Sequence, residues 1–441
     1  MRALKEELRK VQNSTLARNA GWVFIGQGLG FLLQAIYFVL LARLLGTKEY
    51  GIYAGAFALA SMPSAYSTLG TGTLLIRYVS SNKKLLPFYW GNVLVVTSVT
   101  SFVVVGALQL IARRLLDPAS ASIVILCAIG NCFCSQLATC AGQVFQTFER
   151  LRITAMLNLL TNFLRFLAAG TMLLELHRAT ARQWAIASTA VSLIAALTAV
   201  IAVTVKYGRP KFRPKLFFSG AAEGFGYSFA TSTTSVYNDL DKMMLSHYGM
   251  YVANGIYTMA YRVVDIATIP VLSIRDAAMP RFFREGAVGL KRSANLAYSL
   301  LRRALPLALL CTLGMFVLAP LIPRIVGVGF TESILALRWL CFIPVFRSIH
   351  QMTGSALTGA GLQTYRTSSQ VAAAVASLGL NVALIPRYGW LGAAWGSLLT
   401  DGVLALMNSG YLMWLCRTRE SRTVLRDTSL VGSKPVLNLE E

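Results

Sequence analysis

Long apolar stretches recur from the beginning of the chain to its end, and short polar stretches separate them. A bilayer core about 30 Å thick needs a helix of roughly 20 residues, and these stretches have that length. Because a single segment in lipid must satisfy its own backbone hydrogen bonds, each stretch is expected to be an α-helix. Twelve spans are predicted, at 20–41, 52–75, 88–111, 121–144, 154–175, 184–205, 223–245, 252–274, 304–323, 331–352, 367–386 and 390–415.

The composition agrees with this pattern. Of the 441 residues, 55% are hydrophobic and only 13% are charged, whereas soluble domains carry roughly 25% charged residues. A shortage of charge is expected of a chain whose solvent is mostly hydrocarbon. The sequence therefore predicts an all-α membrane protein.

The formal net charge of +23 would suggest a nucleic-acid partner in a soluble protein. Here most Lys and Arg residues lie between the spans and are concentrated in alternate connecting segments. Basic connecting segments stay in the cytoplasm and meet anionic lipid headgroups. We therefore expect a multi-pass protein of the cell inner (plasma) membrane with both termini cytoplasmic, in contact with the lipid bilayer and with no nucleic acid.

A basic stretch from Lys206 to Lys215, with Pro210 and Pro214, follows six predicted spans and precedes six. It divides the chain near its middle. The predicted domains are a cytoplasmic N-terminal segment (1–19), an N-terminal six-helix bundle (20–205), a basic cytoplasmic linker (206–222), a C-terminal six-helix bundle (223–416) and a cytoplasmic tail (417–441).

The two halves resemble each other around a short Gly- and Tyr-rich hairpin. Gly46 followed by Gly51-Ile52-Tyr53 in the first half corresponds to Gly249 followed by Gly255-Ile256-Tyr257 in the second. Six spans per repeat preserve orientation, so the repeats are parallel. Parallel repeats are typical of transporters, with the substrate site at the repeat interface.

These hairpins carry a resemblance to a known family. Ala42–Gly46 followed by Tyr50–Tyr53, Asp241–Leu245 leading into Gly255–Tyr257, and a final hairpin Ile385–Gly389 resemble the polysaccharide and O-antigen flippases of the multidrug/oligosaccharidyl-lipid/polysaccharide exporter (MOP) superfamily. The resemblance covers nearly the whole chain. It implies two six-helix bundles around a central cavity, and it supplies no catalytic motif.

The resemblance also implies a function. The expected activity is that of a flippase, which moves polyprenyl-diphosphate-linked oligosaccharide from the cytoplasmic to the outer leaflet by alternating access, for cell-surface polysaccharide biosynthesis. Other polysaccharide assembly proteins are expected as partners. No cofactor is expected, and coupling to a proton or a sodium gradient is left open.

Ionisable residues inside spans are candidate functional groups, because each costs several kcal/mol unless it faces a cavity or a partner. Arg262 and Asp265 in the eighth span share a helix face and can pair. Arg165 in the fifth span has no acid within reach on its own helix. Because an arginine fork binds phosphate oxygens in two places, Arg165 and Arg262 are predicted to contact the diphosphate. The alternative for Arg262 is a structural pair, and the alternative for Arg165 is a partner on another helix or a water-filled cavity.

Two more arginines, Arg77 and Arg275, lie where the spans meet the cytoplasm. They are predicted to draw the diphosphate into the cytoplasmic mouth. The alternative is that they are ordinary basic residues of cytoplasmic segments.

The seventh span is the most polar, with six hydroxyl residues between 228 and 235 and then Asp239, Asp241 and Lys242. We expect this helix to face a water-filled lumen, although Ser and Thr also bond back to their own helix. The three acids Asp239, Asp241 and Asp265 are predicted to orient the arginines, to bind sugar hydroxyls or to carry a coupling ion.

The predicted substrate-binding set also includes Lys242, and two amides in the first span complete it. Gln27 and Gln34 are seven residues apart and therefore lie on one helix face.

Two other classes compete with the flippase. An ion-coupled drug/cation antiporter would share the fold, but its cationic substrates favour acidic cavities and this chain has only 18 Asp and Glu residues. A membrane-bound glycan polymerase or acyltransferase would need a catalytic constellation. The three His residues lack metal-ligand spacing, and no Gly-rich phosphate loop precedes a Lys. The chain is therefore not expected to be an enzyme or to hold a metal.

Overall fold

A computed structural model of the chain describes residues 15–418, with the side chains of the first helix described from residue 28 onward. Nearly all of the described residues are helical, and there is no β-strand among them. The predicted N-terminal segment 1–19 and tail 417–441 lie mostly outside this range. The all-α fold class is confirmed.

The first half of the chain forms one series of helices. They are α2 (Thr15–Ser61), η1 (Ser64–Ser67), α3 (Thr71–Ser81), η2 (Lys83–Leu85), α4 (Leu86–Leu115), α5 (Pro118–Ala121), α6 (Val124–Ala128), the π-helix η3 (Ile129–Ser135), α7 (Gln136–Thr147), α8 (Leu151–Leu176) and α9 (Ala181–Tyr207).

The second half forms the next series. Its helices are α10 (Pro214–His247), α11 (Tyr251–Val288), α12 (Leu290–Leu318), α13 (Leu321–Val326), η4 (Val328–Phe330), α14 (Ser333–Leu340), α15 (Ile343–Gly359), α16 (Gln363–Tyr388) and α17 (Trp390–Thr418).

A sharp turn at Gly46 divides α2 into two membrane segments. Gly46 has a φ of 67°, which glycine adopts without the steric cost that a Cβ atom brings. Its counterpart in the predicted repeat, Gly249, has a φ of 68° between α10 and α11. Each half therefore has a glycine with a positive φ in the turn between its first two membrane segments.

The two arms of α2 run in opposite directions. Gly30 in the first arm lies beside Asn162 of α8, and the Leu44 carbonyl accepts a bond from Ala179 N just beyond that helix. The first arm is therefore parallel to α8, and it ends where α8 ends.

The second arm is antiparallel to α10. It passes from Gly55 beside Ser246 to Met62, whose carbonyl accepts from the Ser232 hydroxyl. It then continues through η1 into α3. We call the end of the molecule with the Gly46 turn the Gly46 end, and the opposite end, where Gly208 links α9 to α10, the Gly208 end.

The described residues form twelve membrane segments, as predicted. Nine helices are long and apolar enough to cross a bilayer. Helices α10 and α11, with 34 and 38 residues, are also long enough but carry more charge. The turn at Gly46 adds the twelfth, because it separates the second arm of α2 from the first.

Helical structure extends beyond the predicted spans in two places. The stretch 275–303 was expected to be a cytoplasmic loop before a span at 304–323, yet α11 continues to Val288 and α12 runs from Leu290 to Leu318. Hydropathy detects only the apolar part of a helix, and charged turns beyond it remain helical. Helix α10 begins at Pro214, inside the predicted linker 206–222, because proline is favoured in the first helical turn.

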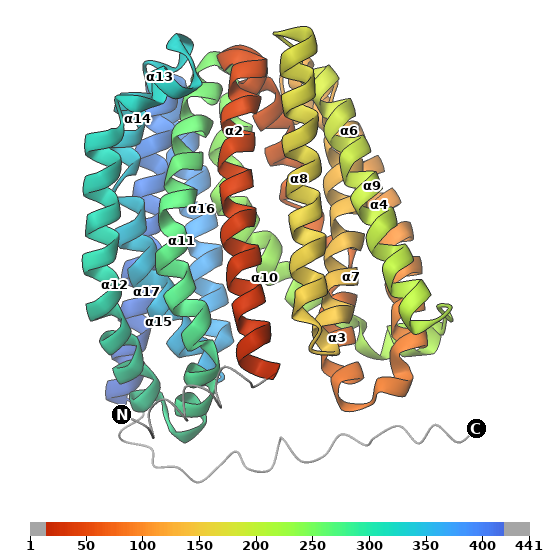
Figure 1. Cartoon of the computed structure of the whole chain (residues 1–441). Helices are drawn as coiled ribbons and strands as arrows, with labels where there is room; N and C mark the ends of the chain where they lie inside the picture. The colour runs from red at the N-terminus through yellow and green to blue at the C-terminus, as the bar shows by residue number, and fades with distance from the viewer. Residues whose placement is uncertain (1–14, 419–441) are drawn as a thin grey trace, which may run out of the picture.

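The helices gather into two groups (Figure 1). Helices α11 to α17 lie on one side and α4 to α9 on the other, with the first arm of α2 and helix α10 between them. This arrangement places the polar helix α10 and the arginine-bearing α11 beside the first half.

The two halves touch backbone to backbone near the Gly46 end. A Cβ atom on Gly51 would lie 1.9 Å from the Tyr251 carbonyl oxygen, and one on Gly255 would lie 2.0 Å from that of Thr47. The Asn254 amide donates to the Gly51 carbonyl at 2.9 Å. The repeat-related glycines therefore form a contact that has no room for side chains.

A second glycine contact lies closer to the Gly208 end. A Cβ atom on Gly70 would lie 2.4 Å from the Gly224 carbonyl oxygen, and one on Gly224 would lie 2.2 Å from that of Leu69. The second membrane segment and α10 are thus in close contact at Gly70 and Gly224.

We expect Gly51→Ala to lower the apparent melting temperature of the detergent-purified protein, because the added methyl group overlaps a carbonyl of the other half and overpacking costs about 1–3 kcal/mol. The matched control is Gly106→Ala in α4, where a Cβ atom would meet nothing within 4 Å. Equal melting temperatures for the two variants would contradict the glycine contact.

Candidate functional site

Three cavities bear on the site, and one of them is lined by both halves. The second-half cavity, of about 280 Å³, is lined by α10, α11, α15 and α17. The first-half cavity, of about 380 Å³, is lined by α2, α7, α8 and α9. The central cavity, of about 130 Å³, lies where α2, α8 and α11 meet.

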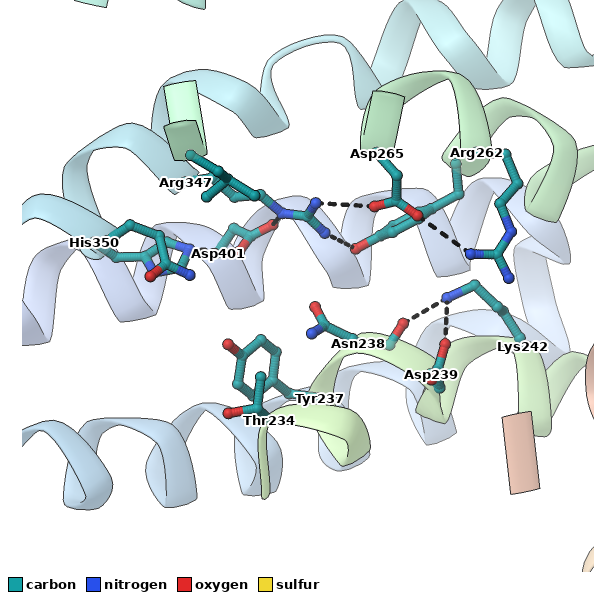
Figure 2. Close-up of a pocket in the computed structure, with 13 residues that line it drawn as sticks. Thr234, Tyr237, Asn238, Asp239, Lys242, Arg262, Asp265, Arg347, His350 and Asp401 are labelled. Atoms are coloured by element: carbon teal, nitrogen blue, oxygen red, sulfur yellow. Dashed lines mark hydrogen bonds and ion pairs between the residues drawn. The ribbon is translucent and has the colours of Figure 1, made fainter. Parts of the chain in front are cut away.

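The second-half cavity is crossed by a chain of charges (Figure 2). The Asp265 carboxylate contacts Arg262 at 3.4 Å and Arg347 at 3.0 Å. Arg347 also donates to the Tyr261 hydroxyl at 2.7 Å. The predicted pair of Arg262 and Asp265 thus forms, but the acid is shared with an arginine of α15.

The chain of charges continues from Arg347 to α17. Asp401 lies 3.9 Å from Arg347 Nε and 3.2 Å from Nε2 of His350. All three side chains are buried, with exposed fractions of 5–11%. Arg347 therefore connects α11 to α17 through two carboxylates.

Lys242 neutralises the carboxylates of its own helix. Its ammonium contacts Asp239 at 3.0 Å and Asp241 at 3.6 Å, donates to the Asn238 carbonyl at 2.5 Å, and lies 4.2 Å from the centre of the Tyr261 ring. The lysine side chain is only 3% exposed. A buried ammonium of this kind needs such partners, because an uncompensated charge there is strongly unfavourable.

The three acids predicted to serve the substrate have different surroundings. Asp239 lines the second-half cavity and accepts from the Ser61 hydroxyl of the first half at 2.6 Å. Asp241 is buried and accepts from the hydroxyls of Tyr257 and Ser397. Asp241 therefore joins α10, α11 and α17, and it is not among the side chains that line the cavity.

The hydroxyls of the seventh span do not form the predicted lumen. Ser228 and Ser232 are buried and donate to the Ala65 and Met62 carbonyls of the first half, at 2.9 and 2.6 Å. Four others bond back to carbonyls of α10. The reason is that the second membrane segment, with its break at η1, presents carbonyls to this helix. Thr234 does line the second-half cavity.

The central cavity is cationic and aromatic. Its lining includes Arg262, Arg165, Gln34 and Thr258. It also includes five tyrosine and phenylalanine rings from the two arms of α2. The Arg262 guanidinium lies 4.9 Å from the centre of the Phe38 ring, and its Nε is buried without a hydrogen-bond partner in the described part of the chain. The cavity lining contains no acid.

Arg165 is the most distinctive of the predicted residues. It lies mid-way along α8, half-buried, and lines both the central and the first-half cavities. Among the described side chains it makes no hydrogen bond or ion pair, unlike Arg262 and Arg347. The structure thus brings Arg165 and Arg262, from different halves, to one cavity.

The two predicted mouth arginines have partners outside the central cavity. Arg77 in α3 pairs with Glu223 of α10. Arg275 in α11 contacts Asp276 at 2.5 Å and the Gln351 amide oxygen at 2.6 Å, and Gln351 lines the second-half cavity. Their attraction of substrate stays a prediction.

The two predicted glutamines differ in what can be said of them. Gln34 lines the central cavity. Gln27 lies in α2, and its side chain falls outside the described part of the structure.

Three residues of the charge chain were missed from the predicted set, namely Arg347, His350 and Asp401. Arg347 and Asp401 both lie in predicted spans, at 331–352 and 390–415. The signal was present, because every ionisable residue in a span is a candidate. Their partners are distant in sequence, and no local spacing connects them.

The fold is that of the MOP-superfamily transporters. The lipid II flippase MurJ, in an inward closed conformation, matches with a TM-score of 0.71 at 11% identity over 92% of this chain and 93% of its own. A multidrug resistance MATE family transporter of the superfamily, inward-facing, gives a TM-score of 0.69 at 13% identity, covering 90% and 99%. A MOP superfamily transporter from Pyrococcus furiosus gives 0.61 at 13% identity, covering 91% and 96%.

The sequence itself defines the family. The polysaccharide biosynthesis protein family matches residues 16–285, more than half of the chain, and the chain belongs to this family. The resemblance drawn from the hairpins is confirmed. No curated protein matches the sequence. The chain is a multi-pass membrane protein of this family.

We expect Lys242→Met to reduce the free energy of unfolding by about 3 kcal/mol, because breaking a buried ion pair leaves an uncompensated charge. Unfolding in detergent mixtures, followed by circular dichroism, measures the change. The control is Lys48→Met, which removes an exposed lysine. Adding Asp241→Asn to Lys242→Met is expected to recover part of the loss. A Lys242→Met protein as stable as Lys48→Met would contradict the pairing.

Proposed function

We propose that the protein is a flippase that moves polyprenyl-diphosphate-linked oligosaccharide from the cytoplasmic to the outer leaflet by alternating access, for cell-surface polysaccharide biosynthesis. We also propose that it acts in the cell inner membrane with both termini in the cytoplasm. It acts as a transporter and not as an enzyme, with transport coupled to a proton or a sodium gradient.

The observation that carries this proposal is the unpaired Arg165 in a cavity that it shares with Arg262 and with no acid. An arginine at membrane depth that lacks an acidic partner needs an anion or water. Two guanidinium groups in one cavity suit the oxygens of a diphosphate, which planar forks bind bidentately.

The position of the central cavity also supports a lipid-linked substrate. Its lining comes from both halves, and parallel-repeat transporters bind substrate at the repeat interface. The headgroup of such a substrate cannot cross hydrocarbon, whereas its polyprenyl tail can remain in the bilayer. A polar cavity within the membrane therefore meets the main requirement. The likeness to a lipid II flippase agrees with this substrate class.

The competing drug/cation antiporter has weaker support. The carboxylates that line the second-half cavity, Asp239, Asp265 and Asp401, each contact a basic side chain of the protein. A cationic drug would have to displace these contacts. A MATE transporter shares the fold, but the central cavity has the opposite charge from the one that such a substrate needs.

Deleting the gene in its host is expected to cause a polyprenyl-diphosphate oligosaccharide to accumulate and surface glycan to fall, as measured by mass spectrometry of lipid extracts. Plasmid-borne wild type should reverse both effects. Arg165→Ala should restore less than about a tenth of the surface glycan, because losing an interaction of about 1.5–3 kcal/mol with a charged group costs tenfold or more. Arg178→Ala is the matched control, since this arginine is exposed beyond the end of α8.

If Arg165→Ala restores full surface glycan at equal expression, Arg165 is not the anion contact. If the deletion changes no lipid-linked intermediate and instead raises sensitivity to cationic drugs, the flippase proposal is wrong and the antiporter replaces it. Arg262→Ala is expected to be impaired as well, since it supplies the second guanidinium of the cavity.

A further inference from the structure

The first-half cavity is a second hollow that opens beside Arg165. With about 380 Å³ it falls within the range of small-molecule sites, roughly 300–1,000 Å³. Its lining comes from the first half alone, and Arg165 is the one residue it shares with the central cavity. A ligand held at Arg165 can therefore extend into it.

The lining of this cavity mixes apolar and polar residues, and Arg165 is the one charged residue among those described. Asn158, Asn162 and Arg165 lie on one face of α8, at spacings of four and three residues. Thr139 of α7 and Ser135 at the end of η3 lie opposite, and the lining contains no acid. This face of α8 thus presents the amides of Asn158 and Asn162 in a row with the Arg165 guanidinium.

Much of the hydrogen-bonding capacity of these groups is unused. Within the described residues, the Asn158 amide has no hydrogen-bond partner, and the Asn162 amide has a long bond of 3.4 Å to the Gly30 carbonyl. The Thr139 hydroxyl donates to the Ser135 carbonyl at 2.8 Å and keeps its lone pairs for a ligand. An amide offers two donors and an acceptor, which suits a ligand that both donates and accepts.

The chemistry of the lining selects the class of ligand. An apolar ligand would leave the amides unpaired, which is costly in a desolvated site. A cation would meet Arg165 and no acid, and an anion would find no second positive charge in this cavity. A neutral polyhydroxylated group joined to an anion at Arg165 can pair with the polar groups of the lining, and its C–H groups can contact the apolar ones.

The second-half cavity is a poorer place for such a group. It is smaller, at about 280 Å³, and its carboxylates and bases already bond to each other. A sugar hydroxyl there would compete with ion pairs, whereas in the first-half cavity it meets free amides.

We propose that the first-half cavity is the subsite for the sugars next to the diphosphate, and that Asn158, Asn162 and Thr139 recognise them. This proposal rests on the proposed function, since Arg165 has to hold the diphosphate. Asn158 lies about 10 Å from Arg165 along α8 at a rise of 1.5 Å per residue, on the side of the Gly208 end. The reducing-end sugar then lies beside Asn162, and the next beside Asn158.

The test measures binding by the purified full-length protein in detergent. The probes are a short-chain polyprenyl diphosphate carrying a hexose disaccharide and the same polyprenyl diphosphate without sugar. Wild type is expected to bind the glycosylated probe at least tenfold more tightly. Leucine has the same number and branching of side-chain heavy atoms as asparagine but cannot hydrogen-bond. Asn158→Leu and Asn162→Leu should therefore remove most of this preference and leave the affinity for the sugar-free probe unchanged.

Three comparisons make the outcome decisive. Arg165→Ala is expected to weaken both probes by the same factor, and Thr171→Val, a lipid-exposed position on α8, should change neither. Thr139→Val provides a second route to the result if an asparagine variant does not fold, with folding checked by thermal melting.

If wild type binds both probes equally, or if the Asn158 and Asn162 variants weaken both probes alike, the sugar subsite is wrong while the diphosphate site stands. If wild type binds neither probe, the proposed flippase function fails together with the subsite.

Discussion

A charge at membrane depth must meet an opposite charge, a hydrogen-bond donor or acceptor, or water, and this requirement decides where the polar groups of this protein lie. In the second half it is met internally, because Lys242 lies between two aspartates and Arg347 between two more. In the first half it is not met internally, because Arg165 has no partner among the described residues. The protein therefore combines a neutralised half, which fixes the geometry of its helices, with a half that leaves one cation available. The second observation has meaning because of the first: Lys242, Arg262 and Arg347 each contact a carboxylate, whereas Arg165 contacts none among the described residues.

The neutralised half also positions the second arginine of the central cavity. Arg262 shares Asp265 with Arg347, and the shorter contact is the one to Arg347, at 3.0 Å against 3.4 Å. Arg262 is thereby held beside Phe38 of the first half, and its contact with Asp265 is long. A group held in place but loosely paired can accept a ligand oxygen without losing a strong bond. Asp265 is best understood as a positioning residue for two arginines. Tyr261 of the same helix and Asp401 of α17 hold Arg347 in the same arrangement.

Local features of the chain could be predicted, and long-range ones could not. The twelve segments follow from apolar length, and the matching turns at Gly46 and Gly249 follow from a repeat that is visible in the residues themselves. The Arg262 and Asp265 pair was found because three residues on a helix bring two side chains together. Arg347 and Asp401 were not, because their partners come from helices distant in sequence. The serines of α10 were assigned to a lumen because no local pattern reveals that a broken neighbouring segment presents its carbonyls to them. Likewise, hydropathy does not detect the charged turns with which α11 continues beyond its apolar stretch.

The contact between Gly51 and Gly255 has a consequence for how this sequence can drift over time. In an ordinary core, a larger residue at one position is tolerated when its neighbour becomes smaller. The two positions can therefore change together during evolution. Here both partners are already the smallest residue, and each faces a carbonyl of the other half and not a side chain. No compensating change is available to either position. The two halves of the chain can diverge elsewhere, but both must keep glycine at these two positions.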